Sequence, residues 1–157
     1  MISEANLSDI QAIMRLERVE GYADQVGRWS KEQHKQELAK TEAMYLLLIQ
    51  DEEIVGFVLL QGVNSPDKCV HLKRIAVASA GRGIGSELLR QTLRYCFEMR
   101  EAHRVELTVF IDNERARAAY IKVGFREEGI LREVYKATDG KFRSMRMMSI
   151  LRPEWVG

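Results

Sequence analysis

Three glycines crowd the point at which a strand-like stretch gives way to a helical one. Gly81, Gly83 and Gly85 stand in AVASAGRGIGSELL, together with Arg82 and Ser86. Glycine has no Cβ, so its backbone can approach a ligand closely. The first N–H groups of a helix have no partner inside the helix, and the helix dipole adds about half a positive charge there. This stretch is therefore typical of a loop that binds a phosphate or a diphosphate.

Two common nucleotide-binding signatures do not fit these glycines. The dinucleotide fingerprint needs the spacing G-x-G-x-x-G, whereas this chain has G-x-G-x-G. The triphosphate-binding loop G-x-x-x-x-G-K-[ST] does not occur in the sequence. A turn that only begins a helix remains the alternative to a phosphate site.

Length and composition predict one globular domain over residues 1–157. The chain has 157 residues, of which 46% are hydrophobic and 30% are charged. The 24 Lys and Arg residues nearly balance the 23 Asp and Glu residues, which argues against a dedicated nucleic-acid binder. Two cysteines and three single histidines lack the spacing of metal ligands, so we expect no metal.

No signal peptide is evident in the N-terminal residues of the sequence. The N-terminal residues MISEANLSDI have no basic region followed by an apolar core, and the longest apolar runs are far shorter than a membrane span. We therefore expect a cytoplasmic protein with no membrane partner.

The apolar periodicity predicts a mixed α+β fold, in which a mostly antiparallel central sheet of about six or seven strands has helices on both faces. Strands are predicted at residues 44–50, 54–61, 69–77, 104–111, 125–133 and 143–151. Helices are predicted from Ser8 or Asp9, from Ser30 with Gln33 as a capping box, over residues 83–99, and from Asp112 or Asn113 to Gly124.

The glycine-rich segment RIAVASAGRGIGSELL resembles motif A of the GNAT superfamily of acyl-CoA N-acyltransferases, whose signature is [QR]-x-x-G-x-[GA]. Gly83 and Gly85 match the two small positions. Ala80 stands at the first position, where the family has Gln or Arg, and Arg82 is a candidate to supply the polar contact.

A second segment strengthens the resemblance. NERARAAYIKVGF is similar to the later family block N-x-x-[AS]-x-x-x-Y-x-x-x-G-F, with Asn113, Ala116, Tyr120, Gly124 and Phe125 in register. The remaining C-terminal residues resemble the bacterial branch that includes ribosomal-protein N-terminal acetyltransferases and small-molecule amine acetyltransferases.

The resemblance implies that acetyl-CoA lies in a V-shaped gap between strands 69–77 and 104–111. The main chain of Ile75, Ala76 and Val77 would pair with the pantetheine arm like an added strand, with an N–H near Val77 aimed at the thioester oxygen. The residues implied to hold the pyrophosphate are Gly81, Arg82, Gly83, Ile84, Gly85 and Ser86. Asn113, Ala116 and Tyr120 would complete the cofactor site.

Acetyl transfer to an amine sets further requirements. A primary amine has a pKa near 10, so its neutral form costs about 4 kcal/mol at pH 7, and a base should remove the proton. The resemblance implies that Tyr120 is the general acid for the departing thiolate. Ribosomal-protein enzymes of the family have a glutamate where this chain has Thr108, so the base stays open among Glu106, His71 and solvent or another residue.

We therefore expect an acetyl-CoA-dependent N-acetyltransferase that acts on a primary amine, with direct attack in a ternary complex. A small molecule is favoured as acceptor because Thr108 replaces the glutamate; a protein N-terminus or lysine is the alternative. A non-catalytic CoA-binding module and an unrelated nucleotide binder are the other classes considered, and a homodimer stays open. Candidate residues for the acceptor pocket are Tyr22, Trp29 and Tyr135.

Overall fold

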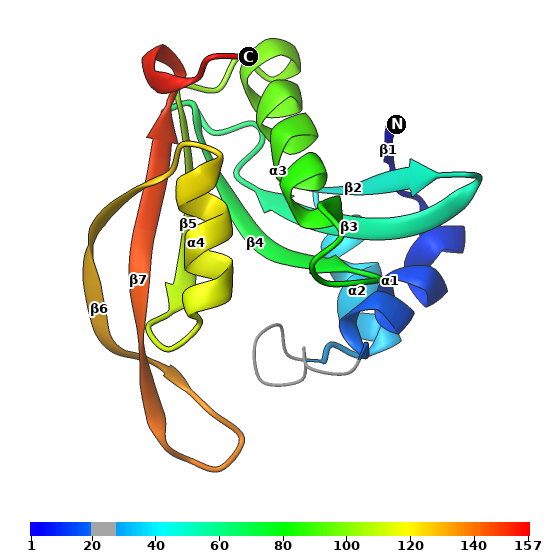
Figure 1. Cartoon of the computed structure of the whole chain (residues 1–157). Coiled ribbons are helices and arrows are strands. Elements are labelled where there is room, and N and C mark those ends of the chain that lie inside the picture. Colours follow the sequence, from blue (N-terminus) through cyan, green and yellow to red (C-terminus); the bar gives the residue numbers. More distant parts are fainter. Residues whose placement is uncertain (20–27) are drawn as a thin grey trace.

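Seven strands form one sheet in the order β1-β2-β3-β4-β5-β7-β6 in the computed structural model, which describes residues 1–19 and 28–157 (Figure 1). The strands are β1 (Ile2–Glu4), β2 (Ala43–Gln50), β3 (Glu53–Gln61), β4 (Cys69–Val77), β5 (Arg104–Phe110), β6 (Arg126–Lys136) and β7 (Phe142–Leu151). The helices are α1 (Ile10–Glu17), α2 (Lys31–Leu38), α3 (Ile84–Arg94) and α4 (Glu114–Lys122), with short turns η1 (Leu7–Asp9), η2 (Tyr95–Met99) and η3 (Arg152–Glu154).

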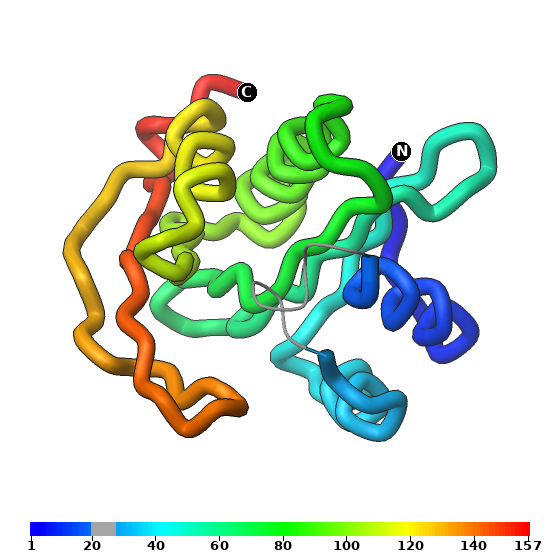
Figure 2. The backbone as a smooth tube through the Cα atoms, turned by 60° about the horizontal axis from the view of Figure 1, so that its bottom comes forward, coloured from blue at the N-terminus to red at the C-terminus, as the bar shows by residue number. Residues whose placement is uncertain are grey.

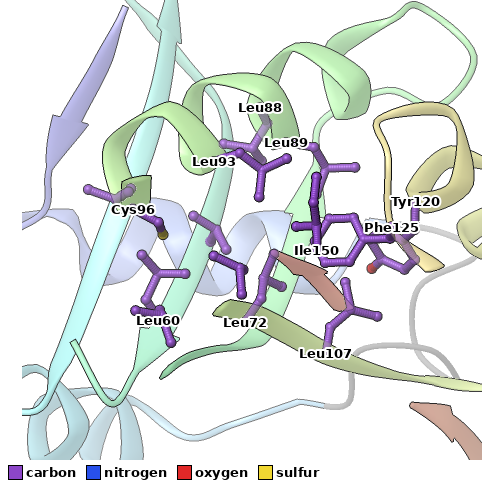
Figure 3. Packing of buried hydrophobic residues seen from close by; sticks show 14 of the residues in the cluster. Leu60, Leu72, Leu88, Leu89, Leu93, Cys96, Leu107, Tyr120, Phe125 and Ile150 are labelled. Carbon is purple, nitrogen blue, oxygen red and sulfur yellow. The ribbon is translucent and has the colours of Figure 1, made fainter. Parts of the chain in front are cut away.

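Helices cover both faces of the sheet, with α3 and α4 on one face and α1 and α2 on the other (Figure 2). The larger apolar cluster lies under α3 and α4 and includes Leu88, Leu93 and Leu107 (Figure 3). A smaller cluster under α1 joins Ile13 to Phe57 and other sheet residues. The predicted α+β architecture is confirmed, and every pair of neighbouring strands except β4 and β5 is antiparallel.

Some local predictions differ from the structure. Asp9 is the N-cap residue of α1, one of the two predicted positions, but its side chain makes no bond within that helix. It belongs instead to a capping box at η1, in which Asp9 Oδ2 accepts the N–H of Asn6 and Asn6 Oδ1 accepts the N–H of Ser8, both at 2.9 Å. The helix predicted over residues 83–99 changes to a π-helical turn after Arg94. The three-residue strand β1 was not predicted, because so short a segment carries no periodicity.

The parallel strands β4 and β5 pair only at their beginnings. Their ladder runs from Cys69 opposite Arg104 to Leu72 opposite Leu107. Beyond Leu72, in strands that the structure describes in full, each continues beside its other neighbour alone, and Figure 1 shows the two diverging. We call the gap between residues 73–77 of β4 and residues 108–110 of β5 the wedge.

Candidate active site

The edge of β4 that borders the wedge presents main-chain groups without a strand partner. The N–H of Ala78 donates to the carbonyl of Val55 at 2.8 Å, and opposite residues in an antiparallel ladder alternate between bonded and non-bonded pairs. The N–H and C=O groups of Val77 and Ile75 therefore point away from β3, toward the wedge, whereas those of Ala76 point toward β3. This edge has the geometry needed to accept an extended ligand as another strand.

The glycine-rich turn lies directly after β4 and leads into α3. Gly81 and Gly83 have φ angles of 75° and 77°, a left-handed conformation that favours glycine. A Cβ added at Gly81, Gly83 or Gly85 would meet nothing within 4 Å, so the chain leaves open space around all three. The first intrahelical bond runs from the N–H of Glu87 to the carbonyl of Gly83.

Three main-chain N–H groups precede that first bond, those of Ile84, Gly85 and Ser86, and they remain available to a ligand or to water. Arg82 is exposed in the same turn. The donors, the exposed guanidinium and the open space together fit a diphosphate, so the residues present fit the coenzyme A predicted from the sequence.

Helix α4 carries the second predicted motif. Asn113 is its N-cap, and its Oδ1 accepts the N–H of Ala116 at 3.2 Å, which confirms the predicted cap. Tyr120 is buried, and its ring packs edge-on against Phe125 with a centroid distance of 5.7 Å. Figure 3 shows Tyr120 and Phe125 at one end of the larger apolar cluster and Cys96 at the other.

A row of polar side chains crosses the sheet on the face opposite α3 and α4. Gln61, His71, Glu106 and Ser149 lie opposite one another on β3, β4, β5 and β7, and we call them the polar row. Gln61 donates to Glu37 of α2 at 2.7 Å, which places the row on the α2 side. The structure thus brings His71 and Glu106 together at the closed end of the wedge. That Gln61 and Ser149 belong to this row could be seen only from the strand register, not from the sequence.

The two candidate bases differ in their surroundings. Burial lowers the pKa of His71 below its ordinary value and the positive charge of Lys73 lowers it further, while the Glu106 carboxylate acts in the opposite direction. Glu106 accepts from the Cys69 thiol at 2.9 Å and lies 3.6 Å from the guanidinium of Arg104. At neutral pH a neutral imidazole therefore stands beside a carboxylate that already has partners.

Neither cysteine is placed to react readily. Burial, reinforced by Glu106, raises the pKa of the Cys69 thiol to about 11, and burial raises the pKa of Cys96 to about 12. Thiolate is the reactive form. We expect an aromatic disulfide reagent to label the native protein slowly at pH 7.5 and both thiols promptly after denaturation, as followed by absorbance. Prompt labelling of one thiol in the native protein would contradict this expectation.

The predicted acceptor aromatics lie at separate places. Trp29 packs against Arg74 of β4, whose guanidinium carbon is 4.5 Å from the ring centroid. Tyr135 of β6 packs edge-on against Phe110 at the end of β5, at 5.2 Å between centroids. Tyr22 lies outside the described residues. Trp29 therefore contacts β4 and Tyr135 contacts the end of β5, the two strands that border the wedge.

A buried ionic cluster near β4 was not predicted from the sequence. Glu17 of α1 is fully buried and bonds to both Arg74 and His34. One signal was present, because Glu17 stands four residues after Ile13 on the apolar side of an amphipathic helix. His34 lies in a highly charged helix that gave no such signal.

Neither a cluster of metal ligands nor a membrane-spanning helix occurs in the described residues. Residues 1–19 and 28–157 contain no group of three or more His, Cys, Asp or Glu side chains arranged to hold a metal ion. No helix within these ranges has the length and apolar character required to cross a bilayer.

Known proteins with similar sequences belong to the family that the sequence motifs resemble. The model of the acetyltransferase (GNAT) family matches residues 10–125. The N-alpha-acetyltransferase RimI of Mycobacterium tuberculosis is 31% identical over 121 residues, which are 75% of this chain and 74% of that protein. The spermidine N(1)-acetyltransferase of Vibrio cholerae is 26% identical over 116 residues, covering 73% of this chain and 66% of that protein.

A solved structure gives the same fold. The Vibrio cholerae spermidine N-acetyltransferase, crystallised with CoA and spermine, superimposes with a TM-score of 0.85 at 20% identity, covering 100% of this chain and 98% of that one. A Bacillus subtilis relative is matched over 60% of its own length. With the family model matching most of the chain, this protein belongs to the GNAT family of acetyltransferases.

Proposed function

We propose that this protein transfers the acetyl group of acetyl-CoA to a primary amine, preferably that of a small molecule, by direct attack in a ternary complex. The observation that carries the proposal is the wedge. A parallel strand pair opens directly beside a glycine turn whose N–H groups suit a diphosphate, so one extended ligand can be held at both places. Acetyl-CoA supplies the activated acetyl group when it is bound there.

The two faces of the sheet divide the proposed chemistry. Tyr120 lies in the apolar cluster on the α3 and α4 face, whereas His71 and Glu106 lie on the other face. The amine nitrogen adds to the thioester carbon as a new substituent, and the sulfur then leaves from another position on that carbon, so the base and the acid act at different places. We assign Tyr120 as the proton donor to the sulfur and the Val77 N–H as a donor to the thioester oxygen.

We assign His71 as the base for the amine, directly or through water, with Glu106 beside it. Because the pKa of His71 is lowered, the imidazole is neutral at pH 7 and accepts a proton, and activity should fall as the pH drops through that pKa. His71→Gln is expected to lower kcat/KM about 10–100-fold and to remove this acidic limb. Steady-state rates between pH 5 and 9 measure both effects.

His103→Gln is the matched control, because His103 lies in the loop before β5 and outside the polar row. Its profile should match the wild type. If His71→Gln keeps the wild-type rate and acidic limb, the assignment of His71 is wrong, and Glu106→Gln becomes the next variant to measure.

The charges on the sheet face that carries the polar row support an acceptor with a single amine rather than a polycation. Arg104 pairs with Glu128 at 2.5 Å and neighbours Glu106, and Arg143 pairs with Asp112 at 2.8 Å. These carboxylates are already balanced by arginine. A protein N-terminus is the second candidate, since a relative is named an N-alpha-acetyltransferase.

A panel of acceptors tests the proposal directly. Single-amine compounds, amino acids, polyamines and N-terminal peptides are incubated with acetyl-CoA, and the released CoA thiol is measured. We expect turnover with at least one single-amine compound. Tight CoA binding without turnover on any amine would favour a binding module, and stabilisation by ATP or NAD at least equal to that by CoA would favour an unrelated nucleotide binder.

We further propose that the chain acts as a single domain in the cytoplasm, without a metal and without a nucleic-acid or membrane partner. The near-neutral charge supports the absence of a nucleic-acid partner. Unchanged turnover after treatment with a chelator is the expected result, and lost turnover that added metal restores would contradict it. Sedimentation measures whether the chain forms the homodimer that the sequence leaves open.

A further inference from the structure

The buried ionic cluster behind β4 consists of four side chains from four elements: Glu17 of α1, His34 of α2, Tyr45 of β2 and Arg74 of β4. Glu17 and His34 are 0% exposed, Tyr45 is 1% exposed and Arg74 is 8% exposed. We define these four residues as the anchor cluster. None of them belongs to the polar row or to the glycine turn.

The Glu17 carboxylate is shared between two partners. Its Oε2 accepts from Arg74 Nε at 2.8 Å and also from Arg74 Nη2, so both bonds of the guanidinium fork end on one oxygen. Its Oε1 lies 2.5 Å from His34 Nε2, and His34 Nδ1 lies 2.6 Å from the Tyr45 hydroxyl. Each member of the cluster is therefore fixed by another member, and Trp29 covers the guanidinium.

Arg74 occupies the position at which β4 leaves β5. The β3–β4 register shifts between Leu72 and Arg74, so Lys73 is the extra residue of a bulge. A bulge bends a strand and increases its twist. The next residues, Ile75 to Val77, lie beside β3 on one side and border the wedge on the other.

We infer that the anchor cluster is a positioning device for acetyl-CoA: it holds the unpaired edge of β4 against α1 and thereby fixes where the Ile75–Val77 main chain meets the pantetheine arm. This inference rests on the proposed function. Burial of a paired charge is a poor source of net stability, because desolvation offsets the attraction. A role in positioning β4 therefore explains the presence of the anchor cluster better than a contribution to stability does.

The inference predicts a specific loss in Glu17→Gln. The amide keeps the shape of the carboxylate but leaves the Arg74 charge without its buried counter-ion. The Kd of CoA, measured by calorimetry, is expected to rise about 10–100-fold, since small misplacements at a binding site have effects of this size. The KM of the amine should change less than twofold. Tyr45→Phe removes only the outermost hydroxyl and should have the smallest effect, with His34→Gln between the two.

Two further variants separate positioning from stability. Phe97→Leu disturbs the packing of Phe97 on Trp155 after the far end of α3, and it should lower Tm while the Kd of CoA stays within twofold of the wild type. In the double variant Glu17→Gln/Arg74→Met, no buried charge is left unpaired, so Tm should recover. The Kd of CoA should nevertheless remain raised, because the bond between α1 and β4 is still absent.

The outcomes of this series are distinct. A Kd of CoA that follows Tm in every variant, including Phe97→Leu and the double variant, overturns the inference, as does wild-type CoA affinity in Glu17→Gln. If Glu17→Gln fails to fold, the order of Kd values in His34→Gln, Tyr45→Phe and the double variant decides in the same way. Failure of the wild-type protein to bind CoA would instead refute the proposed function.

Discussion

Tyr120→Phe is expected to lower kcat about 100–10,000-fold while the protein still binds CoA, because only a proton donor is lost. The phenylalanine ring can keep the edge-on contact with Phe125 and the place of Tyr120 in the apolar cluster, so the fold should persist. Without a donor near the sulfur, the thiolate must leave unprotonated. Release of the CoA thiol gives kcat, and calorimetry gives the Kd of CoA.

Tyr95→Phe is the matched control for loss of a tyrosine hydroxyl. Tyr95 lies in the π-helical turn after α3, and its hydroxyl donates to Glu4 at 2.9 Å, far along the chain from α4. This control should turn over at the wild-type rate. Equal rates for the wild type and Tyr120→Phe would show that the acid is another group, and a parallel loss of CoA binding would point to a binding role for the hydroxyl.

The order of the elements follows from the sequence because each carries its own periodic pattern. Residues 44–50 and 54–61 form strands close to the predicted limits, and the polar turn between them has Asp51 and Glu52 at φ angles of 49° and 65°. The glycine turn was recognisable for the same reason, since its requirements are local. Local chemistry is what a single sequence displays most clearly.

Contacts between distant segments could not be predicted in the same way. Glu17 and Arg74 are 57 residues apart, and only the packing of α1 on β4 makes them partners. The bulge at Lys73 shifts the register by one residue, and no turn residue marks it in the sequence. The position of the wedge therefore depends on tertiary contacts, although both of its strands were predicted.

Asn113 shows that one residue can satisfy two interpretations. It was predicted both as a helix cap and as part of the cofactor site. The capping bond to Ala116 explains its side-chain oxygen, whereas a role in binding would fall to its amide group or to its neighbours and remains a prediction. A motif position therefore does not by itself distinguish a structural role from a contact with ligand.

Substitutions at Gly85 should separate binding of the diphosphate from stability of the fold. Gly85 lies in the first turn of α3, and an added Cβ meets no atom of the chain within 4 Å. Alanine is favoured over glycine in a helix by roughly 0.5–1 kcal/mol, so the Tm of ligand-free Gly85→Ala should stay equal or rise. In Gly85→Val the branched side chain would occupy the space that we assign to the pyrophosphate.

The Kd of CoA is therefore expected to rise roughly tenfold in Gly85→Ala and further in Gly85→Val, since crowding of this kind typically costs about 1–3 kcal/mol. Gly83→Ala provides the contrast, because at a φ of 77° alanine is strained by about 1–2 kcal/mol whether or not ligand is present, so its Tm should fall. Calorimetry and thermal unfolding of the same samples measure both quantities. Unchanged CoA affinity in Gly85→Val would mean that the diphosphate does not occupy the open space beside Gly85, and that it lies elsewhere.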